Sequence, residues 1–265
     1  HMAWQNIALF PEWNCDVPIY LANHHRGFMH EWLRYQAFYL MEYWRMKHGE
    51  DMLGRVWRES ESHEDPITAY KRIAGLSQDQ FNAEVWESAC HDITWDYPLG
   101  GYLRRIVDRQ SEADRQTWYT HKTRLIAENG YYRSYPDTVT ADHGTEQNIA
   151  FTPHDYGYNA FQLSVPEGGT TVTAEFEGIT GDSRYRTVGD SKAGWRFGFV
   201  GVQGSWTPVY GDMGEATGTA PQASVSFTMP GGGLKQLWFV VSGAPTRHEP
   251  HVWDDDVGND EEYPY

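Results

Sequence analysis

The fold class is decided by residues 161–176, which read FQLSVPEGGTTVTAEF. Apolar side chains alternate with others from Phe161 to Val165, and they alternate again from Val172 to Phe176. Alternation of this kind puts one set of side chains on a single face of a β-strand. Between the two runs, residues 166–169 have the composition of a turn. The stretch therefore predicts two short strands that each bury one face.

The same alternation recurs along the rest of the C-terminal half. It appears in residues 195–199, 225–229 and 237–241. Short strands separated by turns rich in glycine and proline are typical of an antiparallel β-sandwich, here of a jelly-roll-like kind.

The N-terminal half has a helical pattern instead. Residues 27–48 carry apolar side chains around most of the helix circumference, which predicts a long helix buried on several sides and ended by Gly49. Asp65 followed by Pro66 has the form of an N-cap and a first helical residue. The helices predicted in this half cover residues 27–48, 51–58, 66–73, the run after the capping box at Ser77, and residues 101–110.

The order of these patterns predicts the domain organisation. Helices first and strands second favour the α+β class over a doubly wound sheet. We expect a helical domain over residues 1–128 and a β-sandwich domain over residues 129–265, with the change at Asn129-Gly130. Residues 115–127 fit either a last helix or a first strand.

Charge and composition exclude several partners. The 265 residues carry a formal net charge of −16, and such a chain is repelled by phosphate backbones and by anionic membranes. No stretch approaches the roughly 20 apolar residues of a membrane helix. Cys15 and Cys90 lie among apolar residues, which favours buried free thiols, with one long-range disulfide as the alternative. Nucleic acid and membrane are therefore not expected as partners.

The densest group of candidate catalytic side chains lies between residues 24 and 31. It consists of His24, His25, His30 and Glu31, with Arg26 beside them. Imidazoles and a carboxylate at this spacing can move protons or contact a substrate. There is no His-Glu-x-x-His pattern, so we expect no complete metal site within this segment. Ordinary histidines at the start of a helix are the structural alternative.

The same segment also belongs to a longer stretch that resembles a known protein family. Residues 24–87 resemble the later part of gluzincin-type metallopeptidase domains, in which a turn is followed by a helix, a Gly-Glu/Asp step and further helices. The matching pieces are His24-His25-Arg26-Gly27, residues 28–47, Gly49-Glu50-Asp51, residues 53–57 and residues 69–76. The resemblance implies that His24 is the donor that stabilises an oxyanion. It also implies that the zinc ligands lie upstream of residue 1, which leaves no metal ligand in this chain.

Two functions of different classes follow. The first is a secreted, extracellular or periplasmic hydrolase-like protein, a fragment of a gluzincin-type metallopeptidase-like protein whose β-sandwich positions a peptide substrate. The alternative is a carbohydrate-active or carbohydrate-binding module that acts on polysaccharide, because Trp195 and Trp206 could stack on sugar rings. In either case Arg26 and Tyr35 are candidate substrate contacts. An interaction module without chemistry is a third interpretation.

An acidic cluster near the C-terminus is a candidate calcium site. Asp254, Asp255 and Asp256 follow one another, and several oxygen ligands suit Ca²⁺. The spacing is not that of an EF-hand loop. A solvated acidic edge is the other interpretation.

Overall fold

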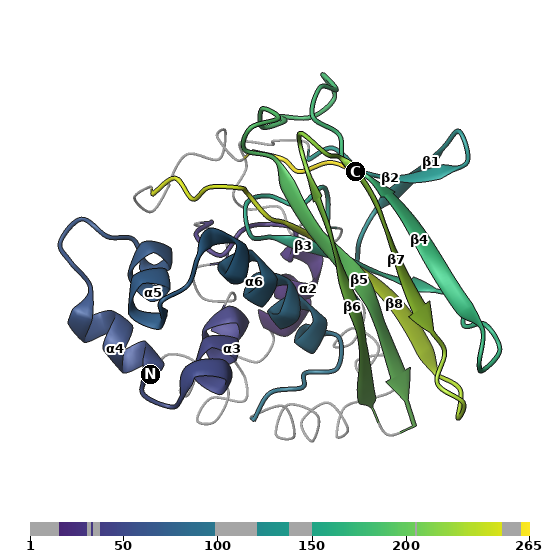
Figure 1. Cartoon of the computed structure of the whole chain (residues 1–265), viewed down its shortest axis with the longest axis horizontal. Helices are drawn as coiled ribbons and strands as arrows, with labels where there is room; N and C mark the ends of the chain where they lie inside the picture. Colours follow the sequence, from purple (N-terminus) through teal and green to yellow (C-terminus); the bar gives the residue numbers. More distant parts are fainter. Residues whose placement is uncertain are drawn as a thin grey trace.

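The computed structural model describes residues 16–30, 33, 38–98, 121–137, 150–204, 206–250 and 261–265. Within these ranges the chain forms helices in its first half and strands in its second (Figure 1). The helices are α2 (Asp16–Asn23), α3 (Phe38–His48), α4 (Met52–Glu59), α5 (Pro66–Ala74) and α6 (Gln78–Asp92). The strands are β1 (Leu125–Glu128), β2 (Tyr131–Ser134), β3 (Tyr158–Leu163), β4 (Thr171–Glu177), β5 (Gly194–Gln203), β6 (Thr207–Thr217), β7 (Gln222–Thr228) and β8 (Gln236–Gly243).

All the pairings between named strands are antiparallel. The central sheet has the order β3-β8-β5-β6, while β4 pairs with β7 and β1 pairs with β2. Helices together with antiparallel sheets confirm the α+β class. A jelly-roll-like sandwich stays a prediction.

Two hydrophobic clusters lie on opposite faces of the central sheet. One combines α3 and α6 with inward side chains of the sheet such as Val200, Trp238 and Val240. The other combines Phe197 and Phe239 of the sheet with Phe176 of β4 and residues of β7. Figure 1 shows the same arrangement, with the helices on the left of the sheet and β4 and β7 on the right. Both faces of the sheet are covered at the central strand β5, which is why all but its last residue are buried.

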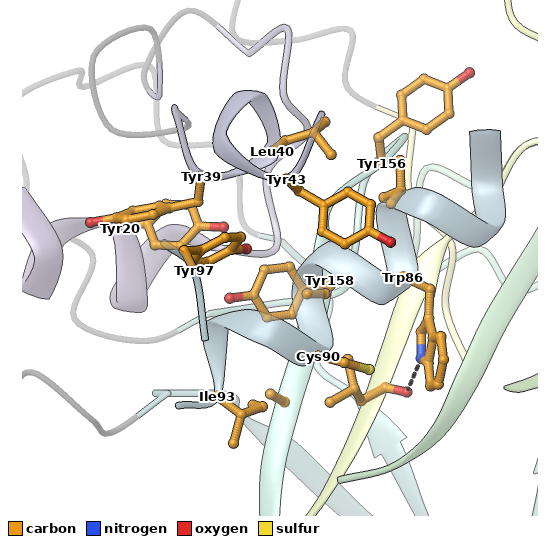
Figure 2. Packing of buried hydrophobic residues seen from close by; sticks show 14 of the residues in the cluster. Tyr20, Tyr39, Leu40, Tyr43, Trp86, Cys90, Ile93, Tyr97, Tyr156 and Tyr158 are labelled. Atoms are coloured by element: carbon orange, nitrogen blue, oxygen red, sulfur yellow. Dashed lines mark hydrogen bonds between the residues drawn. The ribbon is translucent and has the colours of Figure 1, made fainter. Parts of the chain in front are cut away.

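Helix α6 connects the helical part to the sheet. The Trp86 indole donates a hydrogen bond to the carbonyl of Val240 at 3.2 Å, drawn as a dashed line in Figure 2. A Cβ atom at Gly198 of β5 would lie 2.7 Å from the Trp86 ring. Only glycine at this position therefore leaves room for the indole. On the far side of the same cluster, the rings of Tyr20, Tyr39 and Tyr97 gather near α2 (Figure 2). Aromatic rings thus supply much of the buried surface.

Helix ends agree with the local sequence at three places. Asp65 accepts a hydrogen bond from the Thr68 amide at 2.7 Å, Ser77 and Gln80 form the predicted capping box, and Gly75 ends α5 in the left-handed region. The predicted helix over residues 27–48 is wrong at its start, because residues 24–29 form turns and α3 begins at Phe38. Residues 101–110 lie outside the described residues. No helix among the described residues is long and apolar enough to cross a membrane.

The predicted domain boundary falls within a hairpin. Residues 129 and 130 form the turn between β1 and β2, and the register pairs Glu128 with Tyr131. Residues 125–128 are therefore a strand, which decides between the two alternatives for these residues, whereas residues 115–120 lie outside the described residues. The first hydrophobic cluster is shared by helices and strands, so the two halves of the chain pack together through this cluster.

Candidate metal centre

The turn at residues 24–27 packs directly against the loop that leads into β3. His154 N donates to the carbonyl of His25, and Tyr158 N donates to the carbonyl of His24, both at 2.8 Å. The two backbones lie so close that a Cβ atom at Gly157 would be 1.9 Å from the His25 oxygen. Glycine is required there by close approach rather than by its conformational freedom. These contacts hold the backbones of His25 and His154 side by side.

Three side chains meet at this junction. The His154 Nε2 atom lies 3.4 Å from Oδ2 of Asp137, and the His25 Nε2 atom lies 3.8 Å from the same oxygen. One donor atom from each of the three residues falls within 4.8 Å of the other two. His25 is fully buried, His154 is 3% exposed, and the side chain of Asp137 is 6% exposed. The group is therefore almost closed off from solvent.

Some of the atoms that could bind a metal ion have no hydrogen-bond partner among the described residues. Among the described residues, neither ring nitrogen of His25 has a hydrogen-bond partner, and neither does Oδ1 of Asp137. Buried polar atoms are nearly always paired in folded proteins, so atoms left over in a buried cluster need an explanation. An ion or an ordered water that these atoms contact would provide one.

The charge states suit metal ligation. Burial lowers the pKa of His25 to about 3, against the opposing effect of Asp137, so the ring is neutral at pH 7. Burial raises the pKa of the Asp137 carboxyl, but the nearby His154 and His25 outweigh burial and hold it well below its usual range. A neutral imidazole and an ionised carboxylate are the forms that bind metal.

The distances also suit a small divalent ion. Tetrahedral zinc holds nitrogen and oxygen ligands about 2.0–2.2 Å away, which puts two such ligand atoms roughly 3.3–3.5 Å apart. The separations of 3.4 and 3.8 Å at Asp137 are close to this value. Two histidines and one carboxylate are also a known ligand set for iron(II). His25, Asp137 and His154 together are called the His-Asp-His cluster below.

Glu262 positions one side of the His-Asp-His cluster. Its carboxylate is buried and accepts hydrogen bonds from the amides of Asp137 and Arg186, each at 2.7 Å. The Arg186 side chain lies 3.7 Å from Asp137 and 3.7 Å from Glu262. Among the described residues its guanidinium nitrogens have no hydrogen-bond partner. A positive group is thus placed at the edge of the cluster.

Of the four predicted catalytic residues, the three histidines lie within the described residues, and two of them adjoin His154. His25 belongs to the His-Asp-His cluster, and the His30 ring stacks on His154 with centroids 5.9 Å apart. His24 points elsewhere: its Nδ1 atom lies 2.9 Å from the carbonyl of Leu21, and burial lowers its pKa to about 3. Glu31 lies outside the described residues.

The predicted substrate contacts that lie within the described residues are buried or partly buried. Trp195 is fully buried, and its indole donates to the Tyr263 carbonyl at 3.0 Å, so it offers no ring to a ligand. Trp206 packs partly buried against the first hydrophobic cluster, and Arg26 is buried. Tyr35 lies outside the described residues, and so do the calcium candidates Asp254, Asp255 and Asp256.

Asp137 and His154 were not singled out by the sequence. His154 follows a proline in a short loop, and Asp137 follows Pro136, so neither is next to another ligand. The one local signal was His25 itself, which lies in a turn bounded by a glycine of close approach. Only the meeting of that turn with the loop before β3 and the segment after β2 brings the three side chains together.

A family model described as "Family of unknown function (DUF6055)" matches residues 1–265. No curated protein and no solved structure matches the chain.

Proposed function

We propose that this chain, which belongs to the DUF6055 family of unknown function, is a metal-dependent hydrolase whose His-Asp-His cluster binds one divalent transition-metal ion, with zinc as the leading candidate. The observation that carries the proposal is the buried set of unpaired donor atoms from His25 and Asp137 beside His154. The proposal keeps the predicted hydrolase class. It differs from the gluzincin-based expectation in drawing the ligands from this chain.

The number of ligands supports a catalytic rather than a structural centre. Structural zinc sites usually have four protein ligands, whereas catalytic sites have three and leave a position for water. Zinc lowers the pKa of a bound water toward 7, which supplies hydroxide at neutral pH. Arg186 lies at the edge of the cluster, where its guanidinium would stabilise negative charge on a substrate oxygen. These are the parts that metal-assisted hydrolysis uses.

The proposed setting is extracellular or periplasmic, and the proposed substrate is a peptide. The peptide substrate follows from the resemblance of residues 24–87 to gluzincin-type metallopeptidase domains, and the setting is kept from the hypothesis of a secreted hydrolase-like protein. The net charge of −16 supports the exclusion of nucleic acid as a partner.

Metal content and affinity test the proposal. We expect one zinc ion per chain by mass spectrometry of the purified protein. Loss of an outer-shell partner costs about 10–100-fold in metal affinity, so His25→Ala and His154→Ala should each weaken zinc binding more than about 100-fold by calorimetry. His24→Ala is the matched control, because His24 is an equally buried neighbour outside the cluster, and it should keep its zinc.

Two outcomes would count against the proposal. A folded wild-type chain that takes up no zinc, iron or manganese would show that the cluster is only a polar contact between loops. Zinc bound at full stoichiometry without chelator-sensitive cleavage of a peptide library would overturn the hydrolase assignment and leave a structural metal site. Far-UV circular dichroism of each variant separates loss of metal from loss of fold.

A further inference from the structure

A second concave site lies beside the β1–β2 hairpin. It is a groove of about 480 Å³ between this hairpin, the end of β4 and the loop that follows β4. Sites for small molecules usually measure about 300–1,000 Å³. Figure 1 shows the hairpin at the upper right, beside β4 and away from the helices. The residues that define the groove are Glu128, Tyr131, Arg133, Glu177, Asp182 and Arg184.

The walls of the groove are held by backbone and side-chain contacts. Asn129 and Gly130 take φ values of 52° and 84°, which is the geometry of a tight hairpin turn with an Asn-Gly sequence. On the opposite wall, Ile179 N donates to the carbonyl of Pro264 at 2.9 Å, and the Tyr185 hydroxyl donates to the carbonyl of Ser134 at 2.7 Å. The groove is therefore formed before any ligand binds, which lowers the entropy cost of binding.

Its polar side chains are already arranged in pairs. Arg133 lies 3.2 Å from Glu177 across the groove. Arg184 lies 2.7 Å from Asp182 and 3.2 Å from Glu128. Three carboxylates and two guanidinium groups leave a small net charge and offer acceptors and donors side by side. Exposed ion pairs such as these add little stability, so stability alone does not account for three of them around one groove.

Tyr131 supplies an aromatic surface in the same place. Its side chain is 54% exposed, and it lines the groove with Arg133, which follows two residues later on the same face of β2. The next residue, Tyr132, is 70% exposed and does not line the groove. Two adjacent exposed tyrosines on one short strand thus have different surroundings.

We propose that this groove binds a neutral saccharide chain, with a sugar ring stacked on Tyr131 and its hydroxyl groups bonded to the paired arginines and carboxylates. A hydroxyl group both donates and accepts, so it matches a wall of alternating guanidinium and carboxylate groups. A strongly charged ligand would be repelled by one member of each pair. Apolar side chains such as those that anchor a peptide are few, since Ile179 is the only aliphatic one among the described lining residues.

The groove does not depend on the metal centre. Arg184 lines the groove and Arg186 adjoins Asp137, so the two sites share one segment but no side chain. Binding at the groove should therefore persist in the His25→Ala variant. Failure of the metal proposal and failure of this proposal are separate results.

Affinity electrophoresis in gels that contain soluble β-glucan, xylan or galactomannan tests the proposal. We expect the wild-type chain to be retarded by at least one of these neutral polysaccharides. Loss of an aromatic stacking contact should make Tyr131→Ala bind about tenfold more weakly, whereas Tyr132→Ala should bind as the wild type does. Equal melting temperatures of the two variants would show that the difference lies in the groove.

The following results would contradict the proposal of a saccharide site. No retardation of the wild type by any of the three polymers would overturn the proposal, and so would equal loss of binding in both tyrosine variants. Binding of an oligolysine peptide in place of the polysaccharides would identify the groove as a site for basic peptides instead.

Discussion

Asp92 is buried among residues of the first hydrophobic cluster and accepts hydrogen bonds from three tyrosine hydroxyl groups. Tyr20 and Tyr158 donate to its Oδ2 atom at 2.7 and 3.0 Å, and Tyr97 donates to Oδ1 at 2.6 Å. Burial raises the pKa of Asp92 from 3.8 to about 7, although the three hydrogen bonds act in the opposite direction. The carboxyl group is therefore harder to ionise in the folded protein than in the unfolded chain.

This difference predicts how stability depends on pH. Below about pH 3 both states hold the proton, so Asp92 makes no difference. As the pH rises toward 7, the unfolded chain releases the proton first, and the free energy of unfolding falls by up to about 4 kcal/mol. We expect wild type to lose stability relative to Asp92→Asn across this range, as measured by urea unfolding at several pH values.

An exposed carboxylate provides the control. Asp190→Asn should change the free energy of unfolding by less than about 0.5 kcal/mol, because Asp190 lies at the surface. A constant difference between wild type and Asp92→Asn from pH 4 to 8 would contradict the assignment of a raised pKa.

At the scale of single elements, helices α4 and α5 are each preceded by an aspartate at the N-cap position, but only one of the two aspartates forms a capping hydrogen bond. Asp65 caps α5 through the Thr68 amide and also lies 2.7 Å from Nε2 of His248. Asp51 precedes α4 without a side-chain capping bond. We expect Asp65→Ala to lower the free energy of unfolding by about 1–2 kcal/mol and Asp51→Ala to change it by less than about 0.5 kcal/mol. Thermal or urea unfolding of the two variants measures the contrast.

The Asp65 contribution should also vanish in acid. Burial raises its pKa, but His248 and Thr68 outweigh burial and lower it to about 2. A carboxyl with a lowered pKa stabilises the fold above about pH 4 and loses that effect as the pH falls toward 2. If Asp51→Ala proves as costly as Asp65→Ala at neutral pH, the capping explanation is wrong.

Local signals in the sequence predicted elements well where the structure is also local. The caps at Asp65 and Ser77 lie within one turn of the residues they bond, so sequence alone located them. The start at Gly27 was wrong because the backbone of residues 24–27 pairs with a loop far away in sequence. Such a pairing leaves no trace in helical periodicity.

Strand β6 is a second case in which packing between distant residues hides the local sequence pattern. Two of its residues, Gly211 and Gly214, lie against aromatic rings of Phe227 and Phe197 that fill the space of a side chain. Inward positions occupied by glycine hide the alternation that identifies a strand. The His-Asp-His cluster was predictable only in part, for the turn that holds His25 was found while its two partners depend on how the loops meet.

At the scale of the whole molecule, helices and sheet unfold as one unit if their core is shared. Trp86 of α6 is 4% exposed and bonds to β8, whereas Trp57 of α4 is 85% exposed. We expect Trp86→Ala to cost about 3–5 kcal/mol and Trp57→Ala less than about 0.5 kcal/mol. Far-UV circular dichroism and tryptophan fluorescence should report a single coincident transition for the wild-type chain. Two separated transitions would instead indicate independent halves.

The meeting of the turn at His25 with the loop at His154 has a consequence for biosynthesis. His25 is translated well before Asp137 and His154, so a growing chain on the ribosome holds the first imidazole without the other two ligands. Contacts between residues so distant along the chain form only after the cost of loop closure has been met. If the His-Asp-His cluster binds an ion as proposed, loading would follow only after all three side chains have been translated and brought together.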